Sequence, residues 1–130
     1  VPCVEPPWAT LDAVDLVAGE ILWSVPFGTS RDLAPFPFWW IEGVPAIGGA
    51  MTTSTGVVFG AGAMEHAFRA YSAETGEVLW QTRLPTAANS TPMTYQLEEG
   101  GRQYVVVAAG GHMSGYNKAG DHLIAFALPE

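Results

Sequence analysis

Basic residues, long apolar runs and common catalytic motifs are scarce or missing in this chain, and each shortage excludes a class of protein. Lys and Arg number 5 against 13 Asp and Glu, so the net charge at pH 7 is −8. Such a surface repels a phosphate backbone, and no basic cluster offsets it, which excludes nucleic acid as a partner. No apolar run approaches the ~18 residues of a membrane-spanning helix. Without an HExxH, Walker or Gly-x-Ser-x-Gly motif, hydrolase and nucleotide-binding interpretations have no support.

Cysteine is nearly absent, since Cys3 is the only one. A single thiol can form neither an internal disulfide nor a Cys-x-x-Cys metal pair. Cys3 is therefore expected to be an inert thiol, or to pair with a cysteine outside this chain. The chain opens abruptly on Val1, as a fragment or a processed chain would, and no export signal is visible.

What the chain has in abundance is apolar and turn-forming residues. Hydrophobic residues make up 48% of its 130 residues, with 15 Gly, 10 Pro and 5 Trp. A disordered acidic tail would be poor in aromatics, so the composition excludes one. The apolar residues occur in short runs broken by Gly and Pro, which predicts an all-β domain.

An internal repeat organises the chain. Residues 13–23 and 70–80 both read Ala-x-[Asp/Ser]-x-x-x-Gly-Glu-x-x-Trp. Each copy predicts a strand, a tight turn and a second strand, with Gly19 or Gly76 supplying the positive φ that the turn demands. Trp23 and Trp80 fall at the same place on the outgoing strand, where we expect them to pack against a neighbouring unit.

Two polar residues also recur at equivalent positions of the repeat. Asp15 and Ser72 can each accept hydrogen bonds from the backbone of their own turn. The glycines and tryptophans are therefore interpreted as structural docking residues and not as cofactor ligands.

The remaining strands arrange themselves around these hairpins. One complete four-stranded sheet is predicted from strands at 49–54, 57–60, 68–73 and 78–84. Strands at 8–16 and 21–27 end a preceding sheet, and strands at 91–97, 103–109 and 122–128 begin a following one. The count is about two and a quarter four-stranded antiparallel blades, a partial β-propeller. The units are 1–27, the end of one blade; 44–85, a complete blade; and 90–130, an incomplete last blade.

A few blades cannot close a propeller. The first sheet would lack its inner strands and the last its outer strand, which leaves edges that invite pairing. The missing blades must come from a longer protein, a partner chain or further copies of this chain, and the chain alone is expected to be unstable or oligomeric.

Candidate site residues gather in the connections that should share one face of the blades. These connections are 45–49, 61–67, 87–90 and 110–121. The candidates for a substrate or cofactor pocket are His112, Glu65, His66, Asn89, Gly111, Asn117 and Lys118, and Asp121 lies in the same loops.

Each candidate also has a structural interpretation. His112 follows two glycines in a long loop and is either a site residue or a loop histidine bonded to backbone. Glu65 and His66 could serve acid–base chemistry or bind metal, although adjacent polar loop residues are usually solvated. Asn117 and Lys118 are more typical of a turn, and His122 should begin a strand.

The segment 33–42 carries the run Pro-Phe-Pro-Phe-Trp-Trp at 35–40. Its prolines bar it from a central strand. It is either a loop packed over the barrel or an exposed aromatic lip that touches substrate, quinone or a membrane; we favour buried packing.

The hairpins resemble the tryptophan-docking repeats of pyrroloquinoline quinone (PQQ) dehydrogenases. Further motifs resemble the membrane-bound glucose dehydrogenase branch, at its C-terminal end, over essentially the whole chain. They are Pro2-Cys3-x-x-Pro6-Pro7-Trp8-x-Thr10, Pro26-x-Gly28-Thr29, Arg83-Leu84-Pro85, Thr91-Pro92-Met93-Thr94-Tyr95, Gln103-Tyr104-Val105-Val106, Ala109-Gly110-Gly111-His112, Gly120-Asp121 and Ala125-Phe126-Ala127-Leu128-Pro129.

The resemblance implies an eight-bladed periplasmic propeller that holds PQQ and Ca²⁺ and passes electrons from a sugar or polyol to ubiquinone. A membrane attachment would lie outside this sequence. In the family an Asp base and most cofactor and metal contacts lie upstream, so the resemblance assigns no catalytic residue and no metal ligand here. It carries over His112, in the Gly-Gly-His loop near the substrate pocket. Glu65 falls where glucose enzymes can carry Asp, and the loop at 113–118 departs from theirs.

Two functions of different class follow. In the first, the chain completes the propeller of a PQQ-dependent dehydrogenase and shapes one wall of its pocket, while the isolated chain neither binds PQQ and Ca²⁺ nor turns over. In the second, the chain is a non-catalytic propeller fragment that serves protein interaction or assembly. Matches within the loops favour the first, since a scaffold would need only the hairpins and tryptophans.

Overall fold

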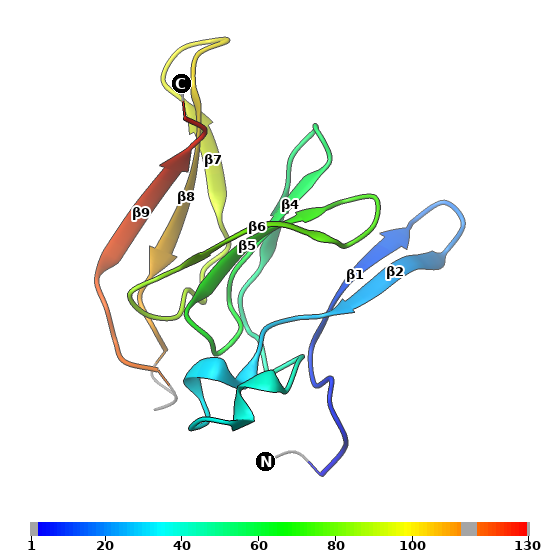
Figure 1. Cartoon of the computed structure of the whole chain (residues 1–130). Coiled ribbons are helices and arrows are strands. Elements are labelled where there is room, and N and C mark those ends of the chain that lie inside the picture. Colours follow the sequence, from blue (N-terminus) through cyan, green and yellow to red (C-terminus); the bar gives the residue numbers. More distant parts are fainter. Residues whose placement is uncertain (1–2, 113–116, 130) are drawn as a thin grey trace.

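The computed structural model describes residues 3–112 and 117–129, which form three antiparallel sheets stacked side by side (Figure 1). The first sheet pairs β1 (Thr10–Asp15) with β2 (Glu20–Pro26). The second has the order β3 (Ala50–Thr52), β4 (Val57–Gly60), β5 (Ala67–Ser72), β6 (Val78–Arg83). The third has the order β7 (Met93–Gln96), β8 (Gln103–Ala109), β9 (His122–Ala127). The all-β prediction is confirmed, with each strand within two residues of its expected ends.

The two hairpins of the repeat have the turn chemistry that the sequence predicts. Gly19 and Gly76 adopt φ of 71° and 75°. Asp15 Oδ1 accepts from the Val17 and Ala18 N–H groups at 2.8 and 3.0 Å, and Ser72 Oγ accepts from the two equivalent N–H groups of its own turn. Because each side chain satisfies N–H groups that the tight turn leaves unpaired, the two hairpins close in the same way.

Both hairpins also contain a one-residue bulge at the same position of the repeat. In the first hairpin the register shifts between Ala13 and Val14, and in the second between Ala70 and Tyr71. As a result Trp80 pairs with Ala70 while Val78, two residues earlier, pairs with Tyr71. A bulge of this kind adds local twist to an outer strand.

Two apolar clusters hold the sheets together. Between the first and second sheets lie Phe27, Val44, Val58, Ala63 and Tyr71. Between the second and third lie Ala61, Phe68, Leu84, Ala88, Val107 and Ala109. Each sheet thus buries one face against the next, which is how propeller blades stack.

Trp23 docks on the turn of the next sheet. Its indole Nε1 donates to the Ala73 carbonyl at 2.9 Å, and a Cβ built at Gly76 would lie 2.7 Å from its ring. Trp80 lies edge-on to Phe126 of the third sheet, with ring centroids 5.4 Å apart. Both tryptophans therefore pack against the following sheet, as the repeat predicts, and the close contact explains why residue 76 is glycine.

The expectation that the aromatic segment is buried is wrong for the described chain. Two short 3-10 helices, η1 (Ser30–Asp32) and η2 (Phe38–Trp40), fold the segment back on itself. The Ser30 hydroxyl and the Trp39 indole donate to carbonyls within the segment. These bonds close the segment on itself, while Phe36, Phe38 and Trp40 are 75%, 53% and 71% exposed.

No helix in the described part of the chain is long and apolar enough to cross a membrane.

Candidate functional site

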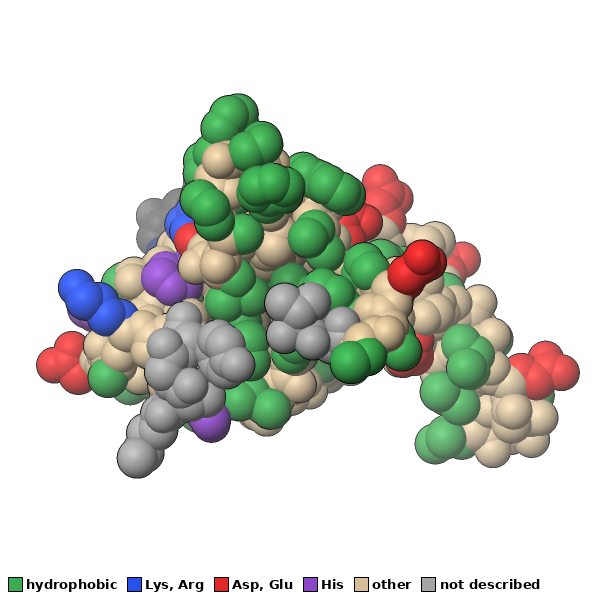
Figure 2. Space-filling model, turned by 90° about the horizontal axis from the view of Figure 1, so that it is seen from below, with side chains coloured by type: hydrophobic (Ala, Val, Ile, Leu, Met, Phe, Trp, Pro, Cys, Tyr) green, Lys and Arg blue, Asp and Glu red, His purple; other side chains and the backbone are tan. Residues whose placement is uncertain are grey.

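The described parts of the connections predicted to share a face lie together at one end of the sheets. In Figure 1 they form the lower side, opposite the hairpin turns of β1–β2 and β7–β8. Ile47 N–H donates to the Gly62 carbonyl at 2.9 Å, and Gly111 N–H donates to the Ala87 carbonyl at 2.8 Å. These bonds join 45–49 to 61–67 and 87–90 to 110–121. Figure 2 views this end of the molecule, where hydrophobic side chains gather in the middle and charged ones lie mostly toward the edges.

Glu65 is buried, whereas a carboxylate in a loop is usually exposed to solvent. Only 2% of its side chain is exposed. It forms an ion pair with Arg69 on β5 and accepts from the Thr29 hydroxyl at 2.6 Å. Burial disfavours the charged guanidinium, but the hydrogen bond and charge of Glu65 outweigh it and raise the pKa of Arg69. Glu65 therefore fastens the connection after β2 to the second sheet.

A second ion pair fastens the same connection. Arg83 donates to both carboxylate oxygens of Asp32, at 2.9 and 2.6 Å, and His66 N–H donates to Asp32 at 2.8 Å. Partial burial acts to raise the pKa of Asp32, but the hydrogen bonds from Arg83 and from His66 N–H outweigh it and lower that pKa. The contact to His66 comes from its backbone, so its half-buried side chain takes no part in this clamp.

The connections on the third sheet pack through backbone contacts. The Thr86 hydroxyl donates to the Lys118 carbonyl at 2.5 Å. Gly111 has φ of 70°, and a Cβ there would lie 2.1 Å from the Lys118 carbonyl oxygen. Gly111 is thus required for close approach of two chain segments, while the Lys118 side chain is exposed.

Two asparagines on these connections carry unsatisfied polar atoms. Both side-chain amide atoms of Asn89 and the Oδ1 of Asn117 are buried without a hydrogen-bond partner in the described part of the chain. Such groups usually cost about 1–3 kcal/mol each, so they mark a place where a partner is expected. His112 lies close by in sequence and is exposed. The structure thus brings Asn89, Gly111, His112, Asn117 and Lys118 to one group of connections and places Glu65 and His66 in another.

Residues 113–116 lie outside the described residues. The departure from the glucose enzymes expected over 113–118 therefore stays a prediction for most of its length.

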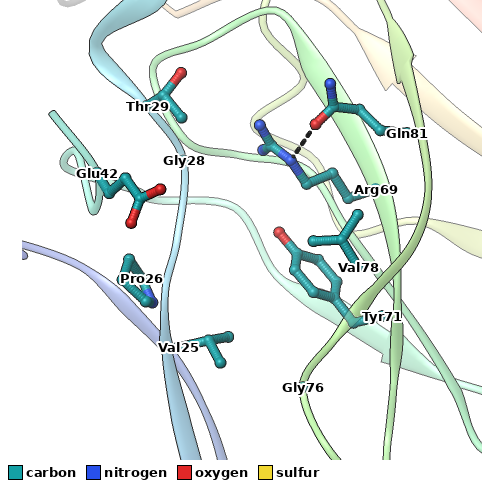
Figure 3. A pocket seen from close by; sticks show the side chains of 10 residues that line it. All are labelled: Val25, Pro26, Gly28, Thr29, Glu42, Arg69, Tyr71, Gly76, Val78 and Gln81. Carbon is teal, nitrogen blue, oxygen red and sulfur yellow. Dashed lines mark hydrogen bonds between the residues drawn. The ribbon is translucent and has the colours of Figure 1, made fainter. Parts of the chain in front are cut away.

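A pocket of about 380 Å³ opens between β2 and the β5–β6 hairpin (Figure 3). Its lining comes from both sheets and from the connection between them: Val25, Pro26, Gly28, Thr29, Glu42, Arg69, Tyr71, Gly76, Val78 and Gln81. Arg69 Nε donates to Gln81 Oε1 at 2.7 Å, drawn as the dashed line. Burial raises the pKa of the Tyr71 phenol above its ordinary value.

The sequence did not predict this pocket, nor the two sets of contacts that hold the connection after β2, Thr29–Glu65–Arg69 and Asp32–Arg83. The contacting residues are far apart in sequence, by 36 positions for Thr29 and Glu65 and by 51 for Asp32 and Arg83. The only visible signal was the four-residue spacing of Glu65 and Arg69. That spacing brings two side chains together on a helix, but it predicts no contact near a strand.

The described residues do not by themselves fit a divalent cation. Across 3–112 and 117–129 no three His, Cys, Asp or Glu side chains come close enough to hold a metal ion. Glu65 already uses its oxygens for Arg69 and Thr29.

Comparison with known proteins gives one consistent result. Residues 1–105 match the family described as PQQ glucose/ethanol/alcohol dehydrogenase, β-propeller domain. The chain is 42% identical to the quinoprotein glucose dehydrogenase of Escherichia coli K12, over 100% of its own length and 17% of that protein. It is 40% identical to a probable quinate dehydrogenase (quinone) of Xanthomonas campestris pv. juglandis, again over 17% of the relative.

A solved structure agrees with the sequence relatives. The quinohemoprotein alcohol dehydrogenase of Comamonas testosteroni superposes with a TM-score of 0.58 at 35% identity, covering 78% of this chain and 12% of that one. The chain thus spans about a sixth of the curated relatives that it matches.

Proposed function

This chain belongs to the family of PQQ glucose/ethanol/alcohol dehydrogenase β-propeller domains. From that premise we propose that it is part of a sugar or polyol dehydrogenase and forms one wall of the pocket for cofactor and substrate. In this proposal it supplies one whole blade and parts of two others, in the units 1–27, 44–85 and 90–130. The other blades belong to the same longer protein, since the relatives are about six times as long. The complete enzyme would act in the periplasm and pass electrons to ubiquinone.

One observation carries the proposal: the likeness is not confined to the hairpins. The family match runs through residue 105 and so includes the connections that hold Thr29, Glu65 and Asn89. An interaction module would need only the stacked sheets and Trp23. Relatives named for glucose and quinate point to a polyhydroxylated substrate.

When bound, PQQ would supply the hydride acceptor, and a cation would supply positive charge beside it. The residues of this chain would hold and orient the bound cofactor and substrate. The ligands of the cation would come from outside this chain. His112, exposed on the 110–121 connection, would contact the substrate. Asn89 and Asn117 would hold the same connection in place, through partners that the rest of the protein or water supplies.

The test uses the dehydrogenase polypeptide that contains this chain, reconstituted with PQQ and Ca²⁺, in a dye-linked assay with glucose and quinate. We expect PQQ-dependent oxidation of at least one of them. His112→Ala should lower kcat/KM about tenfold through loss of one hydrogen bond to the substrate. His122→Gln is the matched control, because His122 begins β9 and should leave kcat/KM unchanged.

Two outcomes would contradict the proposal. If the full polypeptide shows no PQQ-dependent oxidation, the result favours the alternative, a non-catalytic fragment that serves protein interaction. Turnover by the isolated 130-residue chain would show that it is not a part of a larger catalytic unit.

A further inference from the structure

The pocket between β2 and the β5–β6 hairpin has walls of unlike chemistry. Thr29, Glu42, Arg69 and Gln81 present polar groups, whereas Val25 and Val78 form an apolar edge. Figure 3 shows the polar side chains gathered at one end of the pocket and the two valines toward the other. At about 380 Å³ the pocket is within the roughly 300–1,000 Å³ that small-molecule sites occupy.

Two residues of its wall, Arg69 and Tyr71, are held in place before any ligand arrives. The Arg69 side chain is 11% exposed and is held from behind by Glu65 and from the side by Gln81. Tyr71 is 2% exposed, and its phenol lines the same wall. Groups that are immobilised by buried partners lose little further freedom on binding, which is what a built site needs.

The charges of the lining exclude ions of either sign. The positive charge of Arg69 is compensated by Glu65, so the remaining charge in the pocket is the carboxylate of Glu42. An anion would meet that carboxylate. A divalent cation would find one carboxylate only, and the described residues hold no cluster of metal-ligating side chains.

A neutral polyhydroxylated ring fits both the charge and the donor set. Each hydroxyl of such a ring both donates and accepts, which matches a guanidinium donor, a carboxylate acceptor and the Gln81 carboxamide, which does both. The Thr29 hydroxyl gives its proton to Glu65, so its oxygen adds a further acceptor. The C–H face of such a ring would lie on Val25 and Val78. We propose that this pocket is a binding site for a neutral sugar or cyclic polyol, formed between two consecutive blades. The inference uses the lining alone and does not depend on the proposed dehydrogenase activity.

The test is peptide-resolved hydrogen–deuterium exchange on the full polypeptide that contains this chain, without PQQ. The probes are glucose and myo-inositol, with gluconate as the anionic counterpart. Glucose and myo-inositol should slow exchange in the β5–β6 hairpin and at 25–29, and gluconate should do so at least tenfold more weakly. Because turnover is not read, the result stands apart from that of the dehydrogenase assay.

Variants decide whether the protection comes from this pocket. Val78→Trp fills the apolar end and should weaken binding at least tenfold. Leu79→Trp adds the same ring at the next residue, which is 57% exposed and does not line the pocket, and should leave binding unchanged. The proposal is overturned if neither neutral probe protects these segments, if protection survives in Val78→Trp, or if gluconate protects equally.

Discussion

The contact between Trp23 and Gly76 leads to a prediction with a built-in control. Gly76→Ala places a methyl group 2.7 Å from Trp23 Cε3 and 3.0 Å from Val25 Cγ1, at a residue with φ of 75°. Gly19→Ala makes the same change in the same kind of turn, at φ of 71°, but nothing lies within 4 Å of the new methyl. The two variants therefore share a backbone effect and differ in the contact between sheets.

The magnitudes follow from those two contributions. An alanine held at positive φ costs about 1–2 kcal/mol. Overpacking of a fixed contact adds about 1–3 kcal/mol. We expect Gly76→Ala to lower the free energy of unfolding by about 2–5 kcal/mol and Gly19→Ala by about 1–2 kcal/mol.

Urea unfolding of the longer polypeptide that contains this chain, followed by far-UV circular dichroism at matched protein concentration, measures both values. Equal losses in the two variants would refute the reasoning, because the Trp23 contact would then contribute nothing. Gly56→Ala, at φ of 83° with nothing within 4 Å of the new methyl, is a second control for the case in which another blade covers Gly19.

Three further predictions concern the ion pairs and Trp80. Glu65→Gln should destabilise the chain by about 3–5 kcal/mol, because the buried Arg69 loses its countercharge; urea unfolding measures it, and the exposed Glu74→Gln should change little. The pKa of Asp32 lies below the ordinary ~3.9, so its contribution is complete above about pH 4 and is lost as the pH falls through the folded-state pKa. Arg83 is 41% exposed, so the loss of stability should stay below about 1 kcal/mol. Limited proteolysis within 30–42 should become faster below about pH 4. Equal cleavage rates at pH 6 and pH 3 would contradict this role of Asp32. Trp80→Ala should cost about 3 kcal/mol by removing its contacts with Phe68 and Phe126, whereas Leu79→Ala, measured by the same unfolding, should cost much less.

Much of the fold could be predicted because its signals are local. The positive φ of Gly76, the side-chain acceptor Ser72 and the ring of Trp80 lie within one nine-residue stretch, and the same pattern recurs in the first hairpin. A single strong local motif, seen twice, identifies the outer strands of two blades. The other strands then follow from the short apolar runs between them.

The candidate site could be predicted only as a set of connections. Which side chains meet within it depends on pairs far apart in sequence, such as Asp32 with Arg83, and no local pattern encodes them. The same reason explains the error over 33–42. Aromatic residues are usually buried, but the hydrogen bonds from Ser30 and Trp39 close that segment on itself and leave Phe36 and Trp40 exposed.

The bulge in each outer hairpin determines the direction in which whole blades are joined. In a regular strand Val78 and Trp80 would lie on the same face, because side chains alternate with a period of two. The extra residue, Leu79, shifts that alternation by one, so Val78 lines the pocket toward the preceding sheet while Trp80 contacts the following one. Deleting Leu79 would keep the composition of the strand almost intact but turn the indole back into the pocket. The single inserted residue thus decides which of the two neighbouring sheets the Trp80 ring reaches.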